Sequence, residues 1–262
     1  MGCDNDDDPK MVNPPYAINF TIEQTNPNFP TFTSSYSNHS GFPEIDIRDM
    51  VNSQYKLLTE YLHIEYIELL IGVSMGGMQA FEWMVAYPDF MSRLISINGT
   101  TKASFYDKAL WSLIVTLIKD AGHDKEAITY AMQRVSDIGL LASTSPHHLS
   151  KTYASDKYDE VKTQRHAQLS DPMNKLAQSK AILEHDIYKD RDITPQDLAW
   201  HVKARVMIIT AEKDHVVNPI YSRELSEILD CDFLELTGDC GHIAAFCDFE
   251  LVQQAITEFL NN

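Results

Sequence analysis

A short apolar run that ends in a glycine-flanked serine is the feature that most constrains this chain. Residues 66–73 form the run, Ser74 follows between Gly72 and Gly76, and a helical pattern over residues 75–87 begins at once. A strand, a sharp turn and a helix in this order hold a serine hydroxyl exposed in a strained elbow. Glycines are needed there because the neighbouring backbone crowds the turn. The pattern predicts Ser74 as a nucleophile, and an ordinary strand-to-helix turn is the alternative.

The pattern on both sides of this turn predicts an α/β fold. A helical stripe at residues 46–62 precedes it, and a strand-like run at residues 94–97 follows. The same alternation returns near the end of the chain. There the predicted strands are 205–210 and 233–236, and the predicted helices are 219–229 and 249–260. Strands that alternate with helices form a mostly parallel sheet with crossover helices.

Residues 101–197 have a different rhythm. Helical patterns at 106–121, 126–141 and 173–185 are separated by polar loops, and no strand-like run interrupts them. We therefore expect a helical cap inserted into the α/β core. The predicted organisation is residues 1–100 as the first part of the core with the nucleophile, 101–197 as the cap, and 198–262 as the rest of the core.

A serine hydroxyl is a poor nucleophile until a base removes its proton. Of the ten histidines, His242 lies in the loop between the last predicted strand and the last helix. Enzymes with this kind of elbow carry the base after the acid in chain order. Asp214 follows the strand at 205–210, at the carboxyl edge of the sheet where such sites gather. Glu212 is its main rival, and Asp239 is a second, adjacent to the base.

The predicted chemistry is acyl transfer through a covalent intermediate. His242 takes the proton of Ser74, Asp214 orients the imidazole ring, and an acyl-enzyme forms on the serine. The backbone N–H of Met75 would supply half of the oxyanion hole.

Charge and cysteine usage narrow the function classes. The net charge of −17, from 38 acidic and 21 basic side chains, argues against nucleic-acid binding, which needs a basic footprint. No run of about 18 apolar residues is present, so we expect no membrane span. The four cysteines form no C-x-x-C pair and no zinc spacing, which predicts reduced thiols, no metal, and a cytoplasmic protein acting on a small molecule.

The motifs around Ser74 and His242 resemble those of a known enzyme family. The segment Ser74-Met75-Gly76-Gly77-Met78-Gln79, followed by Glu82-Trp83, resembles the homoserine O-acetyltransferase family of α/β hydrolases. Ile47-Arg48-Asp49-Met50-Val51 looks like a helix entry of that family, and Gly241-His242 with Phe246 is similar to its base-bearing loop. The resemblance implies the α/β-hydrolase fold. It is strong over residues 40–100, moderate over 200–262, and weak in the cap.

The resemblance also implies a reaction. In that family an acetyl or succinyl group passes from coenzyme A to the serine and then to the hydroxyl of homoserine. An acyl-coenzyme A would be a co-substrate, with no bound cofactor, and a homodimer would form through the cap helices. Arg48 could pair with a substrate carboxylate, but we expect it to be a surface helix arginine.

The front of the chain departs from the family pattern. Family members carry several strands and a second oxyanion loop before the nucleophile, whereas residues 1–45 here look mostly like loop, with one strand-like stretch at 16–22. We expect an N-terminally shortened version of a longer protein; the alternative is that residues 16–22 replace a strand. Without the earlier strands, residues 66–73 would form an apolar edge strand. A chain without the second oxyanion loop would lack one oxyanion donor, a loss that typically costs about 10²–10³-fold in rate.

Three functions therefore stay open. The first is an acyl-coenzyme A-dependent O-acyltransferase acting on homoserine or a related hydroxylated amino acid. The second is an ester hydrolase that uses Ser74, His242 and Asp214 with water as the acceptor. The third is an inactive protein of the same fold that binds without catalysing. The first is the leading prediction.

Overall fold

The computed structural model describes residues 18–26, 29–36 and 44–261. The chain divides into two compact units, Met1–Glu44 and Ile45–Asn262.

The first unit contains an antiparallel strand pair. Strand β1 (Ile18–Asn26) pairs with β2 (Phe29–Tyr36), and Ile18 lies opposite Tyr36. The strand expected at residues 16–22 is confirmed for its described part, and residues 16–17 lie outside it. Strand β2 was missed, because its aromatic residues Phe29, Phe32 and Tyr36 are separated by proline, threonine and serine without the alternation that signals a strand.

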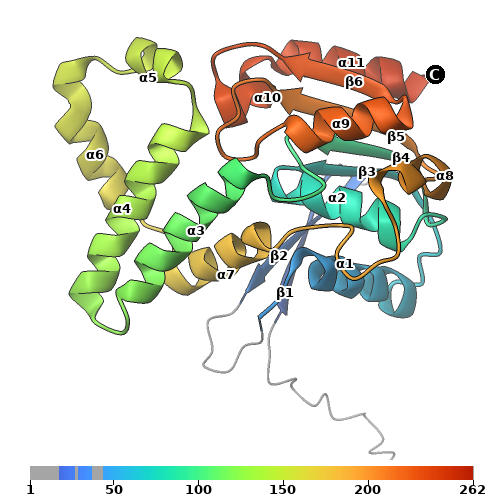
Figure 1. The fold of residues 1–262 in the computed structure, drawn as a ribbon, viewed down its shortest axis with the longest axis horizontal. Coiled ribbons are helices and arrows are strands. Elements are labelled where there is room, and N and C mark those ends of the chain that lie inside the picture. The colour runs from blue at the N-terminus through green and yellow to red at the C-terminus, as the bar shows by residue number, and fades with distance from the viewer. Residues whose placement is uncertain (1–17, 27–28, 37–43, 262) are drawn as a thin grey trace, which may run out of the picture. The chain divides into compact units, whose positions relative to one another are not determined.

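A parallel sheet forms the centre of the second unit (Figure 1). Its strands β3 (Ile67–Val73), β4 (Met91–Ile97), β5 (Arg205–Ala211) and β6 (Asp232–Leu236) lie side by side in that order. Val73 pairs with Ile97, and Ala211 pairs with Leu236. The carboxyl ends of all four strands therefore meet at one edge of the sheet, and the predicted α/β fold is confirmed.

Helices cover both faces of this sheet. Alternate strand residues such as Ile95, Ile97 and Ile209 pack with Val252 and Phe259 of helix α11 (Phe249–Asn261). Helix α2 (Met75–Ala86) contacts β3 and β4, helix α1 (Ile47–Lys56) packs on α2, and α9 (Ile220–Leu229) contacts β5. A π-helical turn, η1 (Leu57–Tyr61), continues α1. Both faces of β4 and β5 are buried, as expected for a covered parallel sheet.

The segment between β4 and β5 is helical. It contains α3 (Phe105–Asp120), α4 (Lys125–Ser143), α5 (Pro146–Thr152), α6 (Tyr158–His166), α7 (Pro172–Leu183) and α8 (Leu198–His201), with 3₁₀ turns η2 (Ser155–Lys157) and η3 (Pro195–Asp197). The predictions at 106–121, 126–141 and 173–185 are confirmed by α3, α4 and α7. Helices α5 and α6 were not predicted, because they bury no residue and so carry no apolar stripe.

Strand β3 is an edge strand of the four-stranded sheet. The side chains of Ile71 and Val73 are about half exposed, at 46% and 45%. This agrees with the expectation of an apolar edge strand at residues 66–73. Such an edge presents unpaired backbone groups together with apolar surface.

Candidate functional site

Ser74 lies in a strained turn between β3 and α2. Its backbone has φ 56° and ψ −119°, a conformation that residues other than glycine seldom adopt. A Cβ on Gly72 would lie 2.0 Å from the Gly76 carbonyl oxygen, so only glycine fits at position 72. The Ser74 N–H donates to the Ile97 carbonyl oxygen at 2.8 Å and anchors the turn to β4. Strain of this kind persists where the surroundings enforce it.

The structure brings Ser74, His242 and Asp214 together from three separate segments. His242 Nε2 lies 2.8 Å from Ser74 Oγ, and His242 Nδ1 lies 2.7 Å from Asp214 Oδ2. The Asp214 side chain is 1% exposed, and its Oδ1 accepts the N–H groups of Val216 and Val217 at 2.8 and 2.9 Å. The carboxylate is therefore fixed in place and aimed at the histidine.

The rival acids have other surroundings. Glu212 is exposed, and its N–H donates to the Leu236 carbonyl oxygen. Asp239 pairs with Lys213 at 2.5 Å, and this hydrogen bond lowers the pKa of the Asp239 carboxyl. His147 Nε2 is 3.5 Å from the same aspartate. Asp239 therefore belongs to a surface charge cluster beside the site.

The backbone N–H of Met75 lies directly after Ser74, at the start of α2. Met75 is the first residue of this helix, and the first N–H groups of a helix have no partner within it. They also lie at the positive end of the helix dipole. The N–H of Met75 is thus suited to stabilise an oxyanion that develops next to Ser74.

Sequence reasoning missed Asn98, which holds the loop that carries His242. Its Nδ2 donates to the His242 carbonyl oxygen at 2.8 Å, although the two residues are 144 positions apart. Asn98 is 2% exposed, and its φ of 50° is tolerated better by asparagine than by most residues. An asparagine followed by Gly99 directly after β4 was the only local signal. The side chain fixes the backbone of the base.

Removal of this hydrogen bond should impair catalysis. We expect Asn98→Gly, which keeps the positive φ, to lower kcat about tenfold, because the His242 backbone then loses a hydrogen bond that positions it and about 1.4 kcal/mol of lost transition-state stabilisation corresponds to tenfold. Asn98→Asp, which cannot donate, should show the same direction. Steady-state kinetics on an acetyl ester measure the change. A kcat equal to wild type for both variants would contradict the role assigned to Asn98.

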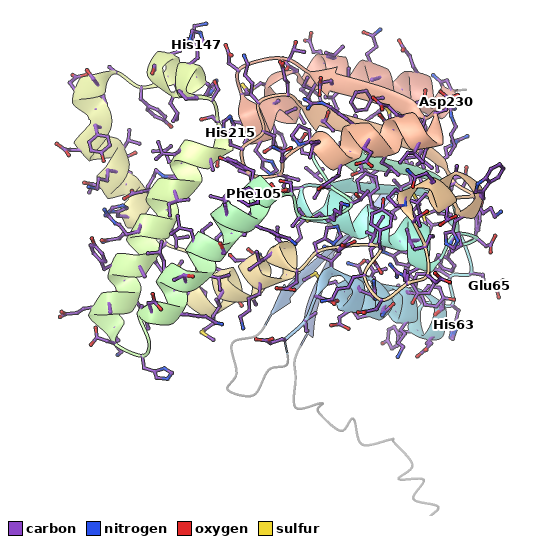
Figure 2. All side chains as sticks on the ribbon, in the orientation of Figure 1. His63, Glu65, Phe105, His147, His215 and Asp230 are labelled. Carbon is purple, nitrogen blue, oxygen red and sulfur yellow. A yellow bond between two sulfur atoms is a disulfide. The ribbon has the colours of Figure 1, made fainter. Side chains whose placement is uncertain are left out.

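The N-terminal end of α3 packs against the loop that follows Asp214. Asp107 is 1% exposed and accepts the N–H of Asn218 at 2.9 Å, and burial raises the pKa of its carboxyl. Tyr106 Oη lies 3.5 Å from His215 Nδ1. Figure 2 shows Phe105, 90% exposed, at the start of α3 beside the loop of His215. The sequence pattern identified none of these residues.

The predicted state of two cysteines is wrong. Cys240 and Cys247 form a disulfide, with their Cα atoms 6.5 Å apart. The short turns η4 (Gly241–Ile243) and α10 (Ala244–Cys247) fold the chain back and bring the sulfurs together, which a search for C-x-x-C spacing does not detect. Cys231 is free, and burial raises the pKa of its thiol to about 12. Cys3 lies outside the described residues. Because disulfides are rare in reducing compartments, the predicted cytoplasmic location loses the support of reduced thiols.

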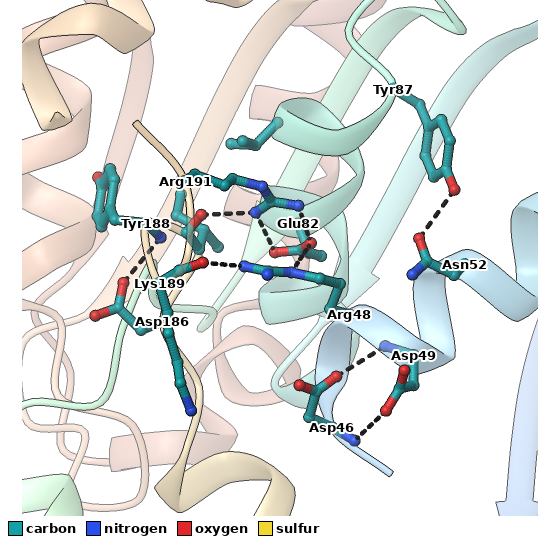
Figure 3. A network of polar contacts seen from close by, with 12 residues as sticks. Asp46, Arg48, Asp49, Asn52, Glu82, Tyr87, Asp186, Tyr188, Lys189 and Arg191 are labelled. Carbon is teal, nitrogen blue, oxygen red and sulfur yellow. Dashed lines mark hydrogen bonds and ion pairs between the residues drawn. The ribbon is translucent and has the colours of Figure 1, made fainter. Parts of the chain in front are cut away.

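Arg48, whose side chain is 27% exposed, takes part in an ionic network around the buried Glu82 instead of lying free on the helix surface (Figure 3). Its Nε lies 3.1 Å from Glu82 Oε1, and Arg191 forms two further hydrogen bonds with the Glu82 carboxylate. Arg48 also donates to the Lys189 carbonyl oxygen at 2.7 Å. Glu82 is 2% exposed. The network joins α1, α2 and the segment after α7, so the expectation of a surface arginine is corrected.

In the part of the chain that the structure describes, no group of three or more histidine, cysteine, aspartate or glutamate side chains could hold a metal ion. No helix among these residues is long and apolar enough to cross a membrane.

Comparison with known families agrees with the observed fold. Residues 20–248 match the family described as the alpha/beta hydrolase fold. The chain belongs to this family. Its sequence identity to individual relatives is below 30%, but the alignments extend over most of the chain.

Two curated relatives illustrate that similarity. Homoserine O-acetyltransferase of Methanosalsum zhilinae is 28% identical over 84% of this chain and 50% of its own length. Ethyl acetate hydrolase of Pseudomonas veronii is 29% identical over 82% of this chain and 66% of its own length. The chain thus spans between half and two thirds of the length of these two relatives.

Solved structures similar to this chain include an esterase and an acetyltransferase. The acetyl esterase MekB has a TM-score of 0.73 at 25% identity, over 84% of this chain and 71% of its own. Homoserine O-acetyltransferase from Bacillus anthracis has a TM-score of 0.74 at 19% identity, over 84% and 66%. The second likeness concerns the fold alone.

Proposed function

We propose that this protein transfers small acyl groups through an acyl-enzyme on Ser74. The observation that carries the proposal is the hydrogen-bonded series Ser74 Oγ, His242 Nε2, His242 Nδ1 and Asp214 Oδ2, set at a strained strand-to-helix turn. A serine, a base and an orienting acid in this arrangement form the working part of many acyl-transfer enzymes.

The steps follow from the geometry. With Nδ1–H donating to Asp214, Nε2 is free to accept the Ser74 proton as Oγ attacks the acyl carbonyl carbon. The Met75 N–H stabilises the oxyanion. The His242 imidazolium, stabilised by Asp214, then protonates the departing thiolate or alkoxide and leaves Ser74 acylated. In the second half, His242 deprotonates the acceptor, which attacks the acyl-enzyme and releases the serine.

For the acceptor and donor, we propose the hydroxyl of homoserine or a related amino acid and acetyl-coenzyme A. The motif around Ser74 and the activity for which the Methanosalsum relative is named support this choice. In this proposal the acyl-coenzyme A is a co-substrate, no cofactor is bound, and residues 101–197 form a cap that excludes water from the acyl-enzyme. A homodimer through the cap helices and a cytoplasmic location remain predictions.

Ester hydrolysis is the second candidate. The Pseudomonas relative is named ethyl acetate hydrolase, and the MekB structure is that of an acetyl esterase. The same three residues serve this reaction if water reaches the acyl-enzyme. The two candidates therefore differ in the acceptor and share the nucleophile.

Acceptor dependence of thiol release separates the candidates. We incubate the protein with acetyl-coenzyme A, with and without homoserine, and follow the free thiol; a parallel assay follows acetic acid from ethyl acetate. Under the transferase proposal, thiol release requires homoserine. Equal release without homoserine, or fast turnover of ethyl acetate alone, would reject it in favour of hydrolysis. If a fluorophosphonate fails to label Ser74 in folded protein, both catalytic proposals are wrong.

A further inference from the structure

The loop that carries His242 is enclosed by the Cys240–Cys247 disulfide. The bond joins residues seven positions apart, and His242 lies between them. The enclosed residues form only the turns η4 and α10, of three and four residues. Helical turns this short are not stable by themselves. Their geometry therefore depends on what ties the loop to its surroundings.

The two ends of this loop differ in how they are held. On the Cys240 side, the Asp239 carbonyl oxygen accepts the Ser145 N–H at 3.2 Å. A Cβ on Gly241 would lie 3.0 Å from the backbone of Lys213 and Ser143, so the chain is closely packed there. Cys240 itself is 9% exposed.

The Cys247 end lies at the surface. Cys247 is exposed, and its neighbours Phe246 and Phe249 are 73% and 60% exposed. The disulfide fastens this exposed end to the packed end beside His242. Apart from it, the part of the loop that follows Gly241 is held by Asn98 at the His242 carbonyl and by the buried Ala244 and Ala245.

We propose that Cys240 and Cys247 are positioning residues: their disulfide holds His242 in line with Ser74 and Asp214, and a dithiol that reduces it lowers acyl transfer. The inference rests on the proposed function, because it concerns the base of that reaction. It adds that the rate of acyl transfer at this site depends on whether Cys240 and Cys247 are joined or reduced.

The exchange is feasible on the observed geometry. A thiolate of the dithiol attacks the sulfur of Cys247, an exposed residue, and the Cys240 sulfur leaves as a thiolate. His148 Nδ1 lies 3.4 Å from Cys240 Sγ, where an N–H at this nitrogen can donate to that thiolate. The second thiol of the reductant then displaces Cys247 from the mixed disulfide. Two electrons and two protons reach the cysteines, and the dithiol becomes a cyclic disulfide.

Reduction should affect turnover more than substrate binding. A displacement of about 1 Å in a catalytic group can cost about 100-fold. We expect kcat, and the rate of fluorophosphonate labelling of Ser74, to fall about tenfold or more on reduction. KM should stay within about twofold, because the proposed effect is on the position of His242 and leaves the Met75 N–H, the group proposed to bind the oxyanion, in place. Re-oxidation should restore the activity.

The test compares oxidised and dithiothreitol-treated wild type with the double variant Cys240→Ser/Cys247→Ser. Cys231→Ser is the matched control, since it removes the described free cysteine and leaves the disulfide in place. Peptide mass spectrometry after alkylation reports whether Cys240 and Cys247 are joined. Circular dichroism and thermal melts show that each sample is folded at the assay temperature.

The inference is supported if reduction slows wild type and Cys231→Ser equally, and if the double variant is slow and no longer responds to dithiol. It is overturned if folded, reduced wild type keeps its kcat and labelling rate, or if Cys240 and Cys247 alkylate without reductant. It is also overturned if the folded double variant is as active as oxidised wild type. A failure of the proposed function looks different, because then even oxidised wild type is not labelled at Ser74.

Discussion

Ser74→Ala should lower kcat for acyl transfer by about 10⁶-fold, the size of loss seen when the nucleophile of such a set is removed. The reason is that Oγ forms the covalent bond, and it is the atom that His242 Nε2 contacts at 2.8 Å. Asp214→Asn should cost less, about 10⁴-fold, because it leaves the nucleophile and base in place but favours the wrong imidazole tautomer. Initial rates on acetyl-coenzyme A and on an acetyl ester measure both.

The matched control for this prediction is Ser150→Ala. Ser150 is an exposed serine of α5 whose hydroxyl donates to the Pro146 carbonyl oxygen. The activity and the melting temperature of the Ser150→Ala variant should therefore equal those of wild type. Ser74→Ala should also lose all fluorophosphonate labelling. If folded Ser74→Ala keeps more than about a tenth of the wild-type activity instead of losing about 10⁶-fold, another group is the nucleophile.

Glu82→Gln should lower the free energy of unfolding by about 3 kcal/mol, near the lower end of the range for removal of one partner from a buried ion pair. The carboxylate is 2% exposed and faces two guanidinium groups, those of Arg48 and Arg191, whose side chains are 27% and 20% exposed. Loss of the negative charge leaves both cations partly buried without compensation. In a chain of this size, the melting temperature should fall by roughly 6–12 °C.

A surface ion pair supplies the comparison for Glu82. Lys157 and Glu160 lie 3.0 Å apart but are 58% and 56% exposed, so Glu160→Gln should change stability by less than about 1 kcal/mol. Urea unfolding followed by circular dichroism measures both variants. Equal effects of the two substitutions would show that burial of the network in Figure 3 does not set its contribution.

Local sequence signals predicted the core of the fold because each of its elements has a strong one. Strand β5 is a continuous apolar run, and α3 and α4 carry apolar stripes that pack inward. The elements that escaped prediction have weak local signals. Strand β2 is rich in threonine and serine, and α6 buries no residue, so neither shows the period of its structure.

The sequence by itself determined the strand–turn–helix at Ser74, the order of nucleophile, acid and base along the chain, and the alternation that builds the parallel sheet. These depend on neighbouring residues, where side-chain size and periodicity act directly. It also left three acids open as partners of His242.

Only the tertiary structure decided which groups meet. It placed Asp214, rather than Glu212 or Asp239, in contact with His242, and it joined Cys240 to Cys247 around that histidine. It likewise brought Asn98 to the His242 carbonyl, 144 positions away. Contacts at such separations depend on how the strands are ordered and how the loops at the carboxyl edge of the sheet pack. A local sequence pattern does not predict which distant side chains meet, because their separation depends on the arrangement of all the elements between them.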